Sequence, residues 1–279
     1  MQASSGLYVS GQSTIDNLDA GLMKAGGDLS LFALGDISNI GSTISGQSVS
    51  LVSFDGNLIN KTLTNQWNAA GKSGVDTLAL SDTQTGDMAS ITAGDSLSMY
   101  AGKSIDITGA HLSAGSDLAM QALGDINISA NQTRELDQRS SRGQNTLTES
   151  TDTQASSISA GGSLAMQAGH DLNISASQIA AKGDATLKAG NDINLQTQEQ
   201  SARSKTSNSE QRLSLVDNTT LNAGGDLTLV AGRDLNSQAA SMSAGDNATL
   251  AAGRDVNLNA EAISSYSESH GKKKQPDRP

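Results

Sequence analysis

Residues 169–174 read Gly-His-Asp-Leu-Asn-Ile, and the same pattern returns three times along the chain. The copies are Gly-Asn-Asp-Ile-Asn-Leu at 190–195, Gly-Arg-Asp-Leu-Asn-Ser at 232–237 and Gly-Arg-Asp-Val-Asn-Leu at 253–258. A repeat of fixed period is typical of a solenoid, in which stacked copies of one unit share a continuous core. We therefore expect an elongated repeat protein and not a globule built around one pocket.

The repeat has a regular internal spacing. The apolar residues that begin short segments follow one another in steps of eight, seven and six residues, so that three segments make a unit of 21 residues. One such run is Leu164, Leu172, Ile179, Ala185 and Ile193; others span 97–126 and 221–263, and a looser copy begins at Leu29. Each segment alternates apolar and polar residues, as a strand with one buried face does. The spacing predicts an all-β fold: a parallel β-helix with three short strands per turn, right-handed by analogy with other β-helices, and about eight turns long.

The composition agrees with this fold and excludes some partners. Aromatic residues make up 2% of the chain, which contains 29 Gly, 2 Pro and no Cys. Slim apolar side chains suit a narrow core, and we expect the corner glycines to adopt positive φ angles. The net charge of −11 argues against nucleic acid as a partner.

A row of asparagines is expected on one outer face of the coil. The polar residue of the second strand in each unit is Asp106 and then Asn127, Asn173, Asn194, Asn236 and Asn257. Stacked side-chain amides form hydrogen-bonded ladders in cross-β assemblies, so we predict a structural ladder. The alternative is a regular binding stripe for a sugar or a surface.

Segments rich in Ser, Thr, Gln and mixed charges interrupt the repeat. The sequence predicts one β-helix rod over 1–263 with inserts at about 52–90, 131–156 and 196–219, followed by an unclosed insert or frayed tail at 264–279. The inserts are either projecting hairpins or disordered. Their exposed cations are candidate contact residues: Arg134, Arg139, Arg142, Arg203 and Lys205.

The pattern contains little that could support catalysis. The three histidines, His111, His170 and His270, do not occupy equivalent positions of the repeat. Repeated Gly-x-Asp is similar to a calcium-binding β-roll repeat, but the period is 21 residues, and Ser104 and Ser163 stand where the aspartate is expected. We expect the aspartates to accept backbone N–H bonds at the corners, as in Asx-turns. We predict no catalytic residue, no cofactor, no metal site and no enzyme activity.

The stretches at 159–174 and 223–236 resemble the haemagglutinin repeats of filamentous haemagglutinin-type exoproteins, and the resemblance covers roughly residues 20–270. It implies a segment of a large secreted bacterial protein, exported by two-partner secretion through an outer-membrane transporter barrel and displayed at the cell surface. The implied function is a structural or adhesive rod that contacts the receptor or membrane of a neighbouring or host cell. The alternative is a toxin-delivery segment of a contact-dependent growth inhibition protein, and a third, weaker possibility is a polysaccharide-acting β-helix enzyme. Since residues 1–6 lack the features of a signal peptide, we also expect an internal segment of a longer chain.

Overall fold

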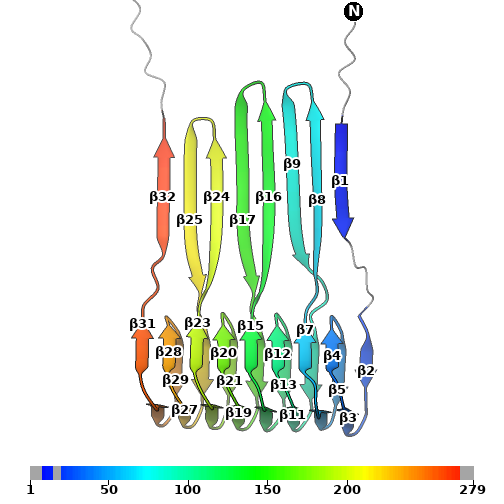
Figure 1. The fold of residues 1–279 in the computed structure, drawn as a ribbon, viewed down its shortest axis with the longest axis vertical. Helices are drawn as coiled ribbons and strands as arrows, with labels where there is room; N and C mark the ends of the chain where they lie inside the picture. Colours follow the sequence, from blue (N-terminus) through cyan, green and yellow to red (C-terminus); the bar gives the residue numbers. More distant parts are fainter. Residues whose placement is uncertain (1–7, 15–19, 271–279) are drawn as a thin grey trace, which may run out of the picture.

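The computed structural model describes residues 8–14 and 20–270, and of residues 8–14 the backbone alone. The described residues form strands and turns arranged in four sheets of eight strands each. Three parallel sheets, B, C and D, wrap into a solenoid, and the fourth, an antiparallel sheet, stands beside it (Figure 1). The predicted parallel β-helix is confirmed. In the part of the chain that is described, no helix is long and apolar enough to span a bilayer.

Each turn of the solenoid passes through sheets B, C and D in that order. Sheet B contains β2 (Leu22–Lys24), β5 (Thr43–Gly46), β10 (Ser90–Ala93), β13 (His111–Ala114), β18 (Ser157–Ala160), β21 (Gln178–Ala181), β26 (Thr220–Ala223) and β29 (Ser241–Ala244). Sheet C contains β3 (Leu29–Ala33), β6 (Val49–Ser53), β11 (Leu97–Ala101), β14 (Leu118–Ala122), β19 (Leu164–Ala168), β22 (Ala185–Ala189), β27 (Leu227–Ala231) and β30 (Ala248–Ala252). Sheet D contains β4 (Ile37–Ile40), β7 (Leu58–Lys61), β12 (Ile105–Thr108), β15 (Ile126–Ser129), β20 (Leu172–Ser175), β23 (Ile193–Gln196), β28 (Leu235–Gln238) and β31 (Val256–Asn259).

The inward side chains stack in register from turn to turn and form one continuous apolar core. Leu97, Leu118 and Leu164 are paired along sheet C, for example, and each is 1% exposed. The alternation of apolar and polar residues read from the sequence is therefore the alternation of inward and outward side chains. Burying one such leucine contributes roughly 1.5–3 kcal/mol to stability.

The corner glycines are required for a different reason from the one expected. Positive φ angles occur at Gly41, Gly74, Gly109 and Gly143 among the described glycines, and not at the repeated corner between sheets C and D. There, a β-carbon added to Gly190 would lie 2.0 Å from the backbone oxygen of Gly169, one turn earlier. The expectation of positive φ at this corner is wrong, because the close stacking of successive turns excludes a side chain.

The expected first insert at 52–90 is too broad. Strands β6 and β7 lie within or across its first ten residues and continue the solenoid, and β10 begins at Ser90. The sequence hides them because the step from Ile44 to Val49 is five residues and the step to Leu58 is nine. The projecting part is the pair β8 (Thr64–Ser73) and β9 (Asp76–Thr85).

The projecting segments are hairpins that join into one sheet, which we call the hairpin sheet. It consists of β1 (Tyr8–Thr14), β8, β9, β16 (Asn131–Ser141), β17 (Gln144–Gln154), β24 (Gln198–Thr206), β25 (Ser209–Asp217) and β32 (Ser264–Ser269), in that order. Neighbouring hairpins pair with each other, β9 with β16 and β17 with β24 (Figure 1). Of the expected tail at 264–279, β32 pairs with β25, and residues 271–279 lie outside the described part.

Hairpins leave the corner between sheets D and B on alternate turns. They follow β7, β15 and β23, whereas β12, β20 and β28 lead directly to the next strand of sheet B. The 67 residues from Ile126 to Ile193 are therefore two turns, one of them with a hairpin, and not about three turns as the sequence suggested. Two turns and one hairpin both advance by two strand spacings, about 9.6 Å, so the two structures keep in step.

Two asparagines occupy core positions near the start of the rod. Asn39 and Asn60 are paired in sheet D at the inward position that Ile107 fills one turn later. The Asn39 Nδ2 group donates to Asn60 Oδ1 at 2.8 Å and to the carbonyl of Ser42 at 2.8 Å. The Asn60 Nδ2 group is buried without a partner. A buried unpaired donor costs about 1–3 kcal/mol.

Replacing both residues, Asn39→Ile with Asn60→Ile, is expected to raise the free energy of unfolding by about 1–3 kcal/mol, because it removes the unpaired amide and extends the isoleucine stack. Asn60→Ile alone is expected to gain less, since it removes an acceptor from Asn39. Urea unfolding followed by circular dichroism measures both. A double variant less stable than the parent chain would contradict this account.

Candidate functional site: the side-chain ladders and the hairpin sheet

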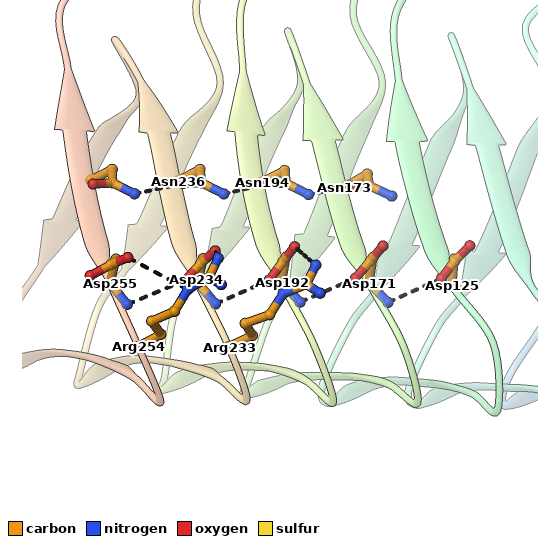
Figure 2. A network of polar contacts seen from close by, with 11 residues as sticks. Asp125, Asp171, Asn173, Asp192, Asn194, Arg233, Asp234, Asn236, Arg254 and Asp255 are labelled. Atoms are coloured by element: carbon orange, nitrogen blue, oxygen red, sulfur yellow. Dashed lines mark hydrogen bonds and ion pairs between the residues drawn. The ribbon is translucent and has the colours of Figure 1, made fainter.

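The five asparagines singled out from the sequence lie on consecutive turns of sheet D and form a chain of hydrogen bonds (Figure 2). Each Nδ2 group donates to the Oδ1 atom of the previous turn at 2.8–2.9 Å, over Asn127, Asn173, Asn194, Asn236 and Asn257. The first member, Asn127, donates to the Asp106 carboxylate at 2.8 Å. Because a carboxylate only accepts, Asp106 fixes the direction of every bond in the ladder.

A second ladder follows the corner between sheets C and D. The Oδ1 atoms of Asp125, Asp171, Asp192 and Asp234 each accept the backbone N–H of the equivalent aspartate one turn later, at 3.0–3.3 Å (Figure 2). The expected acceptor role is therefore present, but the donor comes from the next turn, and not from the same corner as in an Asx-turn. This bond stitches successive turns together.

Serine and asparagine replace aspartate in this ladder without breaking it. The Ser104 N–H donates to Asn57 Oδ1 at 3.1 Å, and the Ser104 hydroxyl accepts the Asp125 N–H at 3.3 Å. At the opposite corner, the Ser163 N–H donates to Asp117 at 2.7 Å. The serines that argued against a calcium repeat are thus members of the ladders. No group of three or more His, Cys, Asp or Glu side chains suited to a metal ion occurs among the described residues.

Two arginines reinforce the aspartate ladder, a role that the sequence analysis missed. The Arg233 Nε atom donates to Asp192 Oδ1 at 2.8 Å, and its Nη2 atom bonds the second oxygen. Arg254 grips Asp234 in the same two-bonded way (Figure 2). The hydrogen bonds from these arginines hold the pKa values of Asp192 and Asp234 below their ordinary range. The signal was present in the sequence, since both arginines directly precede the repeated aspartate.

The five candidate contact cations lie on the hairpin sheet but do not gather at one place. Arg134 pairs with Glu149, and Arg139 bonds Asp137 at 2.7 and 2.8 Å. Arg203 and Lys205 both bond Glu210, at 2.9 and 3.0 Å. Arg142 lies at the tip of the β16–β17 hairpin with a φ of 44°. Four of the five cations are thus neutralised within their own sheet.

Glu210 is the centre of a charge cluster that also includes Arg212. Hydrogen bonds from Lys205, Arg212 and Arg203 lower the pKa of Glu210 to about 2. The unfolded chain has an ordinary glutamate pKa of about 4.3. The stabilisation is therefore complete above about pH 4.3 and is lost as the pH falls towards 2.

Acidification is accordingly expected to reduce the advantage of the parent chain over the variant Glu210→Gln. At pH 6 the parent should melt a few degrees higher, and the two melting temperatures should converge near pH 2. Thermal unfolding measured from pH 6 to pH 2 checks this. A difference that does not depend on pH would show that the carboxylate charge is not what stabilises the cluster.

Comparison with known proteins places the chain in a family. A family model described as hemagglutinin repeat matches residues 70–148, 138–216 and 214–276. Relatives include the tRNA nuclease CdiA of Escherichia coli strain NC101, 54% identical over 46% of this chain and 4% of that protein. The tRNA nuclease CdiA of Yersinia mollaretii is 44% identical over 45% of this chain and 4% of that protein, and the 16S rRNA endonuclease CdiA of Enterobacter cloacae is 49% identical over 40% and 3%.

The matched region thus spans about 4% of the length of the first of these relatives. No solved structure matches the chain. The matches to the family model together cover well over half of the sequence and include every hairpin that follows a described turn from β15 onward. This chain belongs to the hemagglutinin-repeat family.

Proposed function

We propose that the chain is a rod segment of a large secreted bacterial surface exoprotein, which holds other parts of that protein apart and brings it into contact with another cell. The observation that carries this proposal is the continuous stacking of eight turns by the asparagine and aspartate ladders. Such stacking suits a spacer, because each turn is fixed by bonds to its neighbours. The relatives, which are many times longer than the matched region, support a segment of this kind.

We also propose that the chain has no enzyme activity of its own. The relatives carry nuclease names, but the matched region of this chain consists of strands whose polar groups bond one another in ladders. The nuclease activity of those proteins would then reside outside the matched region. Purified chain incubated with transfer RNA should leave it intact, and turnover by the chain would overturn this part of the proposal.

Export and contact form the next part of the proposal. An outer-membrane transporter barrel would export the parent protein, which would then act at the cell surface on the receptor or membrane of a neighbouring or host cell, and not on nucleic acid. Among the candidate contact residues, Arg142 is the best placed, since it is exposed at a hairpin tip. Arg134, Arg139, Arg203 and Lys205 are weaker candidates because each has a carboxylate partner.

A second candidate function is a toxin-delivery segment of a contact-dependent growth inhibition protein. The names of the relatives, which include nucleases and a toxin, favour it. The two functions differ in what they require. A spacer needs only length and stiffness, whereas a delivery segment needs its own particular turns.

A chimera separates the two. This chain would replace the matched segment of the Escherichia coli relative, and growth inhibition of target cells would be measured with and without residues 126–192, which make up two turns and one hairpin. A spacer predicts inhibition by both chimeras, at most a few-fold weaker for the shorter one. Loss of inhibition in the shorter chimera, with surface display unchanged, would favour the delivery function instead.

A further inference from the structure

An exposed apolar patch lies on the first four turns of sheet C and the corner that follows it. On the outer face of the sheet, Phe32 is paired with Val52, and Val52 with Tyr100. Two residues after Phe32 and Val52, the corner carries Leu34 and Phe54, and Leu123 holds the matching place after β14. We call these six residues the apolar patch: Phe32, Leu34, Val52, Phe54, Tyr100 and Leu123.

The patch is strongly exposed. The exposed fractions are 65% for Phe32, 75% for Leu34, 51% for Phe54 and 54% for Leu123. Both phenylalanines of the chain lie here, although aromatic residues make up only 2% of the sequence. A contiguous exposed patch of this kind marks an interaction surface more often than single exposed leucines do.

The repeat itself does not require these side chains. In the later turns, glycine holds the corner position of Leu34 and Phe54, at Gly169, Gly190, Gly232 and Gly253. Along the outer column of sheet C, Tyr100 is followed by Gln121, Gln167 and Lys188. The solenoid is therefore built equally well without the patch, which is confined to one end of the described rod.

Acidic residues border the patch on both sides. The corners flanking β3, β6, β11 and β14 carry Asp28, Asp36, Asp55, Asp95, Asp117 and Asp125, against a single cation, Lys103. None of these aspartates makes an ion pair within the described residues, in contrast with Asp192 and Asp234. Their carboxylates that take part in ladders, such as Asp36 on the Asn57 N–H at 2.7 Å, keep their charge while accepting a neutral donor.

From these observations we propose that the apolar patch is a docking site for a basic amphipathic segment of a partner protein, with two or three apolar side chains flanked by Lys or Arg. The patch spans three strand spacings, about 14 Å, which suits apolar residues on neighbouring turns of one helix or alternate residues of one strand. The aspartate borders supply the complementary charge.

The same borders argue against other occupants. A second copy of this chain would bring two acidic borders together in a protein whose net charge is −11. An anionic membrane would meet the same repulsion. A basic segment gains from both the apolar area and the charge, and its binding should weaken with added salt, since the aspartates are exposed to solvent.

The test uses two labelled synthetic helical peptides as probes, each with Leu and Phe on one face and either Lys or Glu on the other. Fluorescence polarisation with the full chain should show binding of the Lys peptide, at least tenfold weaker binding of the Glu peptide, and a loss of affinity from 50 to 300 mM salt. The variant carrying Phe32→Ser and Phe54→Ser should bind the Lys peptide at least tenfold more weakly. The matched control is Val230→Ser, in the same outer column four turns beyond Tyr100, which should bind like the parent chain.

Several results would overturn the proposal. One is equal binding of the Lys peptide by the Phe32/Phe54 variant and the parent, with both folded by circular dichroism. Another is a dimer of the parent that the double variant abolishes, which would identify a second copy as the occupant. Binding to phosphatidylcholine vesicles that depends on the two phenylalanines, without peptide binding, would identify a lipid surface. The proposal rests on this surface alone and stands or falls separately from the rod function.

Discussion

Replacing Gly190 by alanine is expected to lower the free energy of unfolding by about 3 kcal/mol or more, the upper end of what overpacking causes. The added β-carbon would lie 2.0 Å from the Gly169 backbone oxygen. The backbone cannot move aside easily, because the Gly190 N–H donates to the Ala168 carbonyl at 3.0 Å and the Asn191 N–H to the His170 carbonyl at 2.9 Å. Both bonds would have to lengthen to admit one methyl group.

The matched control is Gly26→Ala. Gly26 also lies at a solenoid corner, but no atom lies within 4 Å of a β-carbon built there, and its φ is not positive. This variant should stay within about 0.5 kcal/mol of the parent, as surface substitutions usually do. Urea unfolding of both variants measures the difference. If Gly190→Ala proved as stable as Gly26→Ala, close stacking would not be the reason for the corner glycines.

The predictable part of this fold is the part that repeats. Leu164, Leu172 and Ile179 return at fixed steps because each occupies the same place in the cross-section, and that place is set by one local unit. The asparagine row follows from the same register, so its five members could be named before any coordinates were known. The two turns around Val49 and Leu58 were missed because their corners differ in length by one or two residues, which breaks the step without breaking the stack.

The hairpin sheet could not be predicted in the same way. Its hairpins pair with one another, as β17 does with β24, and the paired residues Ser150 and Ala202 are 52 positions apart with no repeating motif between the strands. The sequence left hairpins and disorder both open, because polar β-strands and polar loops share a composition. What decides between them is the spacing of the solenoid itself, which places each hairpin beside the next.

That spacing leads to the second large prediction, which concerns deleting whole turns. Removing residues 172–192, one plain turn of 21 residues, joins Asp171 to Ile193 and leaves the stack of sheets B, C and D in register. It also places the β16–β17 and β24–β25 hairpins on consecutive turns. Four strands, which need about 19 Å of sheet, would then rise from two turns that advance about 9.6 Å. One hairpin must leave the sheet, while the solenoid survives.

The measurement is hydrogen–deuterium exchange of the segments 131–154 and 198–217. In the 21-residue deletion, one of the two segments should exchange at least tenfold faster than in the parent chain, because its strands lose their neighbours. Deleting residues 126–192 instead removes a plain turn together with a hairpin turn, restores the alternation, and should leave 198–217 as protected as before, now paired with β9. Full protection of both hairpins in the 21-residue deletion would show that the sheet does not depend on this match of spacings. The alternation of plain and hairpin turns would then have to come from the hairpin sequences themselves. If the expected result is found, the 67-residue pair of turns is the smallest unit by which this rod can be lengthened or shortened without disturbing its hairpin sheet.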